Sequence, residues 1–213
     1  TFDADGEIKD YDFYEAKIKS KYRLIYAEVE EAILRKKKIG SESVNESINA
    51  LKELTIVLLN KRAKRNALEI ESSEPILEIN NIGAVEAINL SRRMFAHQMI
   101  EEAMIAANIC AITFVKSSLE ISINRFHDKP DADKLLALFE KFQSFGLKRS
   151  DDPIVLLQRC IEIAKRSENA TSLQSLILQG LPRAIYSSKK SGHFGLQLEE
   201  YSHFTSPIRR YPD

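Results

Sequence analysis

The sequence predicts an α+β fold that is rich in helix, with helices packed on a mixed or antiparallel sheet. Several segments repeat apolar residues at helical spacing, and short alternating segments flank two tight-turn signals. One long segment is apolar on nearly all sides, which indicates a buried central helix. Of the 213 residues, 44% are hydrophobic and 29% are charged, as expected for a globular protein with a substantial core.

Local signals define the elements in order. Asp5 and Gly6 predict the turn of a first hairpin, and Asn80–Gly83 predicts the turn of a second. Glycine, proline and asparagine residues separate the later helices. We expect a hairpin over residues 1–19, helices over 26–34 and 50–68, a hairpin over 76–90, a buried helix over 91–116, a short strand over 121–126, helices over 131–145, 153–165 and 172–186, and a strand over 192–204.

Composition limits the possible settings of the protein. The 31 basic residues balance 31 acidic ones, so net charge gives no argument about nucleic acid. Cys110 and Cys160 lack metal-type spacing and are interpreted as buried free thiols in a reducing compartment. The longest apolar run, Ala103–Val115, is too short to span a bilayer, and no signal peptide is visible. We therefore expect a cytoplasmic protein with no membrane partner. Both ends are abrupt, which predicts one partial domain over residues 1–213, truncated at both ends.

The last eleven residues, His203–Asp213, carry the clearest chemical signal. Two prolines stiffen the backbone around Arg209 and Arg210, with the Ser206 hydroxyl beside them. A guanidinium on a rigid support suits a transferring phosphoryl group, because its fork donates two hydrogen bonds to phosphate oxygens. Adjacent arginines diverge, so only one of them is expected to point at a phosphate. From chemistry alone, an exposed arginine pair in a loop is the more common explanation.

The same residues, HFTSPIRRYPD, resemble the signature of the ribonuclease II/R (RNB) superfamily. Similar matches occur in order at Ser20–Tyr26, Met99–Asn108, Arg125–Pro130 and Gly192–Leu196, and they favour the ribonuclease R branch. The resemblance implies the second half of an RNB catalytic domain. It also implies a processive 3′→5′ exoribonuclease that hydrolyses RNA to nucleoside 5′-monophosphates and works as a monomer.

The resemblance assigns roles to individual residues. Arg209 matches the catalytic arginine, which stabilises charge on the attacked phosphate. Glu101 matches a glutamate that contacts the sugar of the 3′-terminal nucleotide. The other residues expected to contact RNA are Arg210, Ser206, His193, Tyr201 and Ile70.

Helix geometry is consistent with different environments for Glu101 and its neighbour Glu102. Glu101 and Glu102 lie about 100° apart on a helix, so both can scarcely share one environment. A ribose 2′-hydroxyl is a natural donor to a carboxylate and separates RNA from DNA. From the residues alone, two solvated glutamates that favour the helix start are the more common explanation.

This sequence departs from the family in two features. Ile70 stands where the family places an aromatic residue that stacks on a base, so we expect a weaker hold on the 3′ end. The chain also offers no aspartates at the family's spacing. We therefore expect no metal ligand here, and Mg²⁺ held by aspartates upstream of Thr1.

Other functions stay open. A non-catalytic RNA-binding homologue of the same fold is the alternative to the enzyme, and Ile70 favours it. An unrelated helical binding module is a third, remote possibility. The basic clusters Arg35–Lys38 and Lys61–Arg65 either follow an RNA backbone or form solvated helix faces.

Overall fold

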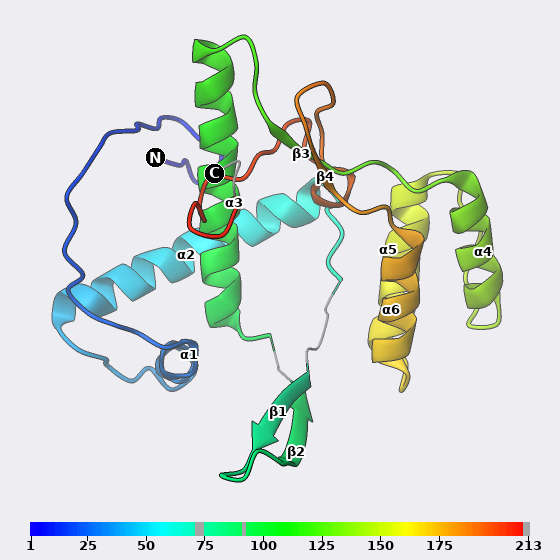
Figure 1. Cartoon of the computed structure of the whole chain (residues 1–213), viewed down its shortest axis with the longest axis horizontal. Coiled ribbons are helices and arrows are strands. Elements are labelled where there is room, and N and C mark those ends of the chain that lie inside the picture. Colours follow the sequence, from blue (N-terminus) through cyan, green and yellow to red (C-terminus); the bar gives the residue numbers. More distant parts are fainter. Residues whose placement is uncertain (71–74, 91–92, 211–213) are drawn as a thin grey trace. The chain divides into compact units, whose positions relative to one another are not determined.

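The computed structural model describes residues 1–70, 75–90 and 93–210 (Figure 1). Its elements are α1 (Tyr26–Arg35), α2 (Glu42–Lys64), β1 (Pro75–Ile79), β2 (Val85–Leu90), α3 (Phe95–Ser118), β3 (Asn124–Phe126), α4 (Ala132–Gln143), α5 (Pro153–Arg166), α6 (Ala170–Gly180), β4 (Ile185–Ser187) and a short 3₁₀ helix, Phe194–Leu196. The expected helix-rich α+β class is confirmed. The sheets are two antiparallel pairs, β1–β2 and β3–β4.

The chain divides into two compact units, each of which is discontinuous in sequence. Unit 1 comprises Thr1–Arg65, Met94–Ile123 and Tyr201–Asp213. Unit 2 comprises Asn66–Arg93 and Asn124–Glu200. The family signature at the end of the chain therefore belongs to the same unit as α2 and α3.

Unit 1 is built from α1, α2 and α3. A small apolar cluster of Val29, Ile48, Ala96 and Met99 joins the three helices. Polar residues complete the interior, because Thr55, Arg62, Glu102 and Asn108 are also buried. Burying such groups is costly unless each one is hydrogen bonded, so their partners are decisive for this unit.

Helix α3 is the most apolar helix of the chain. Its 24 residues extend beyond the expected apolar run Ala103–Val115 at both ends. By length and composition alone the helix could therefore cross a membrane. Buried Glu102 and Asn108 on this helix bind side chains of α2 and of the C-terminal segment. These contacts are typical of the central helix of a globular unit, as the apolar pattern predicts.

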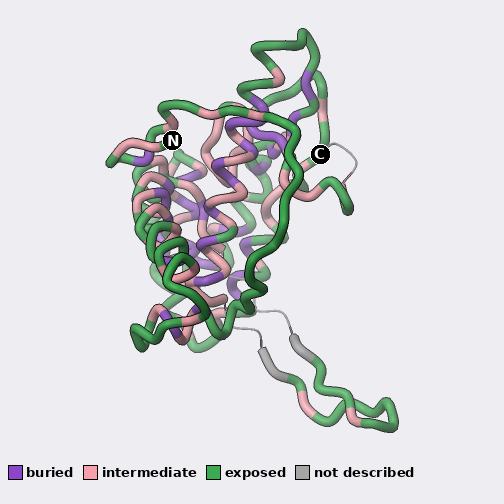
Figure 2. The backbone as a smooth tube through the Cα atoms, turned by 90° about the vertical axis from the view of Figure 1, so that its left-hand side faces the viewer, coloured by how far each residue is buried: buried purple, intermediate pink, exposed green. Residues whose placement is uncertain are grey.

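Unit 2 has a larger and more apolar interior, formed by α4, α5 and α6. Phe142, Leu157, Cys160, Ala164 and Ile177 are completely buried in it. Burial raises the pKa of the Cys160 thiol to about 12, so it is an inert core residue. Figure 2 shows buried residues along the helices and exposed residues over most of the β1–β2 hairpin.

The predicted second hairpin is confirmed. Strands β1 and β2 pair antiparallel on either side of the expected turn. The Asn80 side chain accepts hydrogen bonds from the backbone N–H groups of Ile82 (3.2 Å) and Ala84 (2.9 Å), and Gly83 has φ 83°, which glycine adopts at little cost.

Four expected elements are wrong in whole or in part. The helix expected over 50–68 is α2, which begins at Glu42 and ends at Lys64. The first hairpin is reduced to a turn at Asp3–Gly6 and one bridge between Phe2 and Ile8. The last long helix ends at Gly180 because Pro182 follows, and residues 185–187 form β4 instead. The strand expected over 192–204 is a 3₁₀ turn, in which the His193 Nδ1 atom accepts from the Leu196 N–H at 3.2 Å.

Candidate functional site

The segment before the arginine pair is fixed to α3 by one side chain, that of Asn108. The Asn108 Nδ2 atom donates to the Tyr201 hydroxyl at 2.9 Å, and the Phe204 N–H donates to Asn108 Oδ1 at 2.8 Å. The Ser202 hydroxyl also donates to the Ile123 carbonyl at 2.5 Å. Asn108 is only 1% exposed, so its two hydrogen bonds are made in a setting where losing them is costly. These hydrogen bonds therefore fix the path of the backbone from Tyr201 to Phe204.

A tight turn then presents the two arginines differently. The N–H groups of Arg209 and Arg210 both donate to the Ser206 carbonyl, at 3.2 and 3.1 Å. The Arg209 side chain is exposed, and its Nη2 atom donates to Ser206 Oγ at 3.4 Å, whereas Arg210 is half-buried. The expected divergence of the two side chains agrees with this difference. Residues 211–213 of the signature lie outside the described residues.

Arg62 binds both adjacent glutamates, Glu101 and Glu102, in the second turn of α3. Its Nη1 atom lies 2.8 Å from Glu101 Oε1 and 2.7 Å from Glu102 Oε1. Burial disfavours the charge of Arg62, but the hydrogen bonds and charges of the two glutamates hold its pKa above the usual value. The two glutamates do differ in burial, with side chains 37% and 3% exposed, yet they share one cation, which the sequence argument did not foresee.

The Tyr201 hydroxyl is influenced by charges from both the Glu101 region and the arginine segment. Burial raises the pKa of the Tyr201 hydroxyl, and the Asn108 hydrogen bond and the positive charges of Arg210 and Arg62 oppose this rise, whereas the Glu101 charge adds to it. These charges therefore act on the same phenol. Glu101 and Asn108 are seven residues apart, which places them on one face of α3 about 10.5 Å apart along its axis. Unit 1 thus contains Glu101, Tyr201, Ser206 and the arginine pair, and Asn108 links the segment of the arginine pair to the helix that carries Glu101.

Two expected site residues, His193 and Ile70, belong to unit 2. The His193 ring lies against that of His127, with ring centres 4.8 Å apart, and both residues join a backbone bridge. Ile70 is partly buried against the apolar core of unit 2. Their contact with RNA stays a prediction, as do the RNA-binding and catalytic roles of the residues in unit 1.

His127 was not singled out from the sequence, yet it organises unit 2. Its Nδ1 atom accepts from the Gly195 N–H at 3.0 Å, and its Nε2 atom lies 2.9 Å from the Pro182 carbonyl. This arrangement requires a neutral ring with the proton on Nε2. Burial accordingly lowers the pKa of His127, and the Arg125 charge acts in the same direction. A β-carbon at Gly195 would lie 3.1 Å from the His127 ring, closer than ordinary van der Waals contact, so a side chain there would press on the ring.

The two basic clusters have different environments. In the Lys61–Arg65 cluster, Lys61 pairs with Glu7 at 2.8 Å, Arg62 is buried with its glutamates, and Lys64 lies 4.0 Å from Asp5. This cluster is mostly engaged inside unit 1 rather than open to a ligand. In the first cluster, Arg35 pairs with Glu31 at 3.1 Å.

Within residues 1–70, 75–90 and 93–210, no group of three or more His, Cys, Asp or Glu side chains is placed to hold a metal ion. The described donor set does not fit the two-metal centre that the family resemblance implies. No step of the chemistry below is therefore assigned to a metal ligand of this chain.

A helix-rich α+β fold, with a glutamate in the second turn of its central helix and an arginine pair in a fixed turn, defines the class of this protein. The family model for the RNB domain matches residues 1–213. The chain belongs to the RNB domain family, which confirms the resemblance of its motifs.

Curated and structural relatives agree with this placement. Ribonuclease R of Escherichia coli is 34% identical over 224 residues, which cover all of this chain and 27% of that protein. The apo structure of Mycoplasma genitalium RNase R is 27% identical with a TM-score of 0.90, over all of this chain and 34% of the other. That RNase R is also known in complex with ribose-methylated single-stranded RNA and with double-stranded RNA.

The fold alone is shared more widely. Yeast Ssd1, described as a pseudonuclease, has a TM-score of 0.69 at 21% identity, over 99% of this chain and 26% of the other. The chain thus spans about a quarter to a third of the length of these relatives.

Proposed function

We propose that this chain forms part of the catalytic region of a hydrolytic exoribonuclease, which removes nucleotides processively from the 3′ end of RNA as nucleoside 5′-monophosphates. The observation that carries the proposal is the joining of Glu101 and the arginine turn in one unit through α3 and Asn108. Membership of the RNB family and the RNA complexes of a related RNase R support it.

Glu101 is proposed to accept a hydrogen bond from the 2′-hydroxyl of the last nucleotide. Its pairing with Arg62 keeps the carboxylate oriented, and a carboxylate has about four acceptor positions, more than this contact uses. A DNA strand lacks that hydroxyl, so Glu101 would favour RNA over DNA.

Arg209 is proposed to stabilise the charge that develops on the attacked phosphate. It is the exposed member of the pair, and the Ser206 carbonyl and hydroxyl hold its backbone and side chain. Arg210, Ser206 and Tyr201 would complete the RNA contacts of unit 1. His193 and Ile70, in unit 2, are also proposed to contact RNA. We further propose that Mg²⁺ held outside this chain supplies the metal chemistry, and that the protein acts as a monomer in the cytoplasm.

The deciding experiment compares the two arginines in the full-length protein. Arg209→Ala should lower kcat on single-stranded RNA by a factor of about 10²–10³ while RNA still binds, because the variant loses one charge-stabilising group. Arg210→Ala, the matched control, should mainly weaken binding. Normal turnover by Arg209→Ala would remove the assigned role.

A non-catalytic RNA-binding protein of the same fold is the second candidate. Ile70 favours it, because isoleucine cannot stack on a base as an aromatic side chain does. RNA binding without hydrolysis by the full-length protein, in the presence of added Mg²⁺, would decide for this candidate. Release of nucleoside 5′-monophosphates would exclude it.

A further inference from the structure

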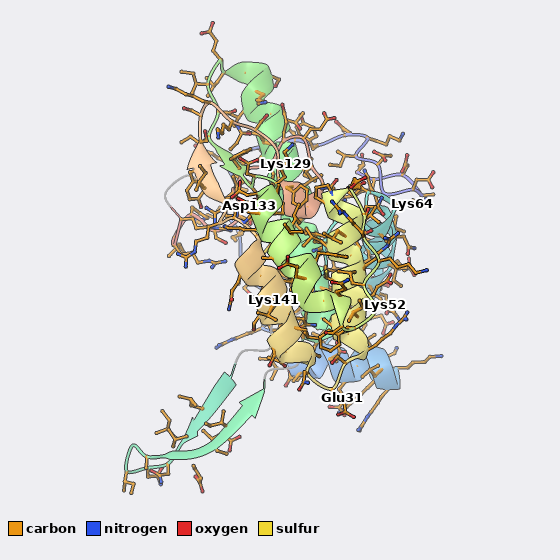
Figure 3. All side chains as sticks on the ribbon, turned by 90° about the vertical axis from the view of Figure 1, so that its right-hand side faces the viewer. Glu31, Lys52, Lys64, Lys129, Asp133 and Lys141 are labelled. Carbon is orange, nitrogen blue, oxygen red and sulfur yellow. The ribbon has the colours of Figure 1, made fainter. Side chains whose placement is uncertain are left out.

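A cavity of about 340 Å³ lies in unit 1 between the end of α1 and the first half of α2. Four of the residues that line it are lysines: Lys36, Lys37 and Lys38 follow α1, and Lys52 projects from α2 (Figure 3). Lys52 is distant from the other three in sequence, so the fold adds a fourth lysine to the basic cluster Arg35–Lys38 that the sequence already showed.

The charge of this lysine cavity is largely uncompensated. Lys38 pairs with Glu42 at 2.8 Å, and Glu42 is the only acidic side chain in the lining. Lys36, Lys37 and Lys52 form no ion pair with any residue of the described ranges, although Lys52 is half-buried. This environment is the opposite of that of Lys61–Arg65, where acidic partners neutralise most of the positive charge.

The backbone conformation at Lys36 does not require a lysine side chain. Lys36 ends α1 in the left-handed conformation, with φ 51°, where glycine is the usual residue. A non-glycine residue in this conformation has its β-carbon crowded against the following carbonyl oxygen, which destabilises the helix end. Replacing Lys36 by glycine should therefore remove the charge without weakening the helix end.

We propose that the lysine cavity binds the phosphates of a single-stranded nucleic acid backbone, at a position other than that of Glu101 and Arg209. Lysine ammonium groups attract phosphate as point charges, and the residues that line the cavity include no aromatic ring on which a base would stack. The site therefore reads the backbone and not the sequence. The proposal rests on the proposed function in taking RNA as the physiological strand.

The test measures binding of an oligouridylate about 12 nucleotides long, and of its deoxy counterpart, to the full-length protein without Mg²⁺ at several salt concentrations. In the variant that combines Lys36→Gly, Lys37→Gln and Lys52→Gln, both strands should bind more weakly. The slope of log K against log salt is negative, and in this variant it should become less steep by about 2, since each of the three lost phosphate contacts removes about 0.7. Glu42→Gln should strengthen binding, because it frees Lys38.

The control variant removes the same charge from exposed lysines of unit 2, through Lys134→Gln, Lys141→Gln and Lys148→Gln. It should leave the slope nearly unchanged. An equal loss in the control, an unchanged slope in the cavity variant, or a loss limited to RNA would each overturn the phosphate site.

Glu101→Gln separates this proposal from the proposed function. It should reduce the preference for RNA over DNA and leave the effect of the cavity variant intact. If only Glu101→Gln has its expected effect, the lysine cavity fails and the proposed function stands. If the chain binds neither strand, the RNA ligand fails for both.

Discussion

The interiors of the two units differ in chemistry. Unit 2 packs a broad apolar cluster around fully buried Phe142 and Leu157. Unit 1 has a small apolar cluster and buries Arg62, Glu102 and Asn108 together. Apolar packing contributes stability in proportion to buried area, whereas buried polar groups contribute little net stability but allow few alternative arrangements. The comparison indicates that unit 1 uses its interior to position side chains and unit 2 uses its interior for stability.

The largest expected effect tests the polar interior. Arg62→Met should lower the free energy of unfolding of unit 1 by about 3–5 kcal/mol, because it leaves the Glu102 carboxylate buried without the cation bound to it. The neighbouring Lys61→Met loses an ion pair with exposed Glu7 and a hydrogen bond to the Gly6 carbonyl, and should cost about 0.5–2 kcal/mol. Urea unfolding measures both values. Similar losses in the two variants would contradict the distinction between a buried and an exposed pair.

The apolar interior should respond to a cavity instead. Leu157→Ala should cost about 2–5 kcal/mol, since Leu157 is fully buried among apolar neighbours. Leu136→Ala on α4, where the side chain is 51% exposed, should change stability by less than about 0.5 kcal/mol. Urea unfolding again gives the values, and a small loss for Leu157→Ala would show that the core of unit 2 is loosely packed.

A smaller effect is expected where the polar interior holds the arginine segment. Asn108→Ala removes both hydrogen bonds of the amide and should cost about 1–3 kcal/mol. Amide hydrogen exchange of Phe204 should speed up, because its N–H loses its acceptor. Tyr201→Phe removes only the hydroxyl and should leave that exchange nearly unchanged. Equal protection of Phe204 in the Asn108 variant would show that other contacts hold the segment.

The smallest effect concerns pH and unit 2. The pKa of His127 is lowered in the folded chain, so below its ordinary value near 6.5 the unfolded state binds a proton more readily. The stability due to the neutral ring is complete above pH of about 6.5 and is lost as pH falls below it. Urea midpoints between about pH 5 and 7 should show this loss, and His127→Gln should remove it. An unchanged slope in that variant would assign the pH dependence to other groups.

The elements that were predicted correctly are those determined by residues close together in the sequence. The apolar spacing of α1 and α5 and the Asn80–Gly83 turn are written in neighbouring residues, and the structure confirms all three. The 3₁₀ turn at Phe194–Leu196 depends instead on long-range contacts, such as Phe194 N–H to the His127 carbonyl at 2.9 Å. An alternating apolar pattern alone therefore predicted a strand there incorrectly.

The residues of the candidate site also divide into those found from local motifs and those whose role depends on distant partners. Glu101 and Arg209 were found because they lie in recognisable motifs. The residues that hold them, Arg62 and Asn108, were missed because their partners lie 39 to 96 positions away in the chain. A single asparagine inside the most apolar helix was the one available signal, since a buried amide must have polar partners.

The seven-residue spacing on α3 has a consequence for how such chains can diverge. One residue inserted between Glu101 and Asn108 would rotate the asparagine by about 100° and shift it by about 1.5 Å, away from Tyr201 and Phe204. Length changes within this stretch should therefore be rejected during evolution. The turn at Asn80–Gly83 is largely exposed, so insertions should be tolerated there better than within this stretch of α3.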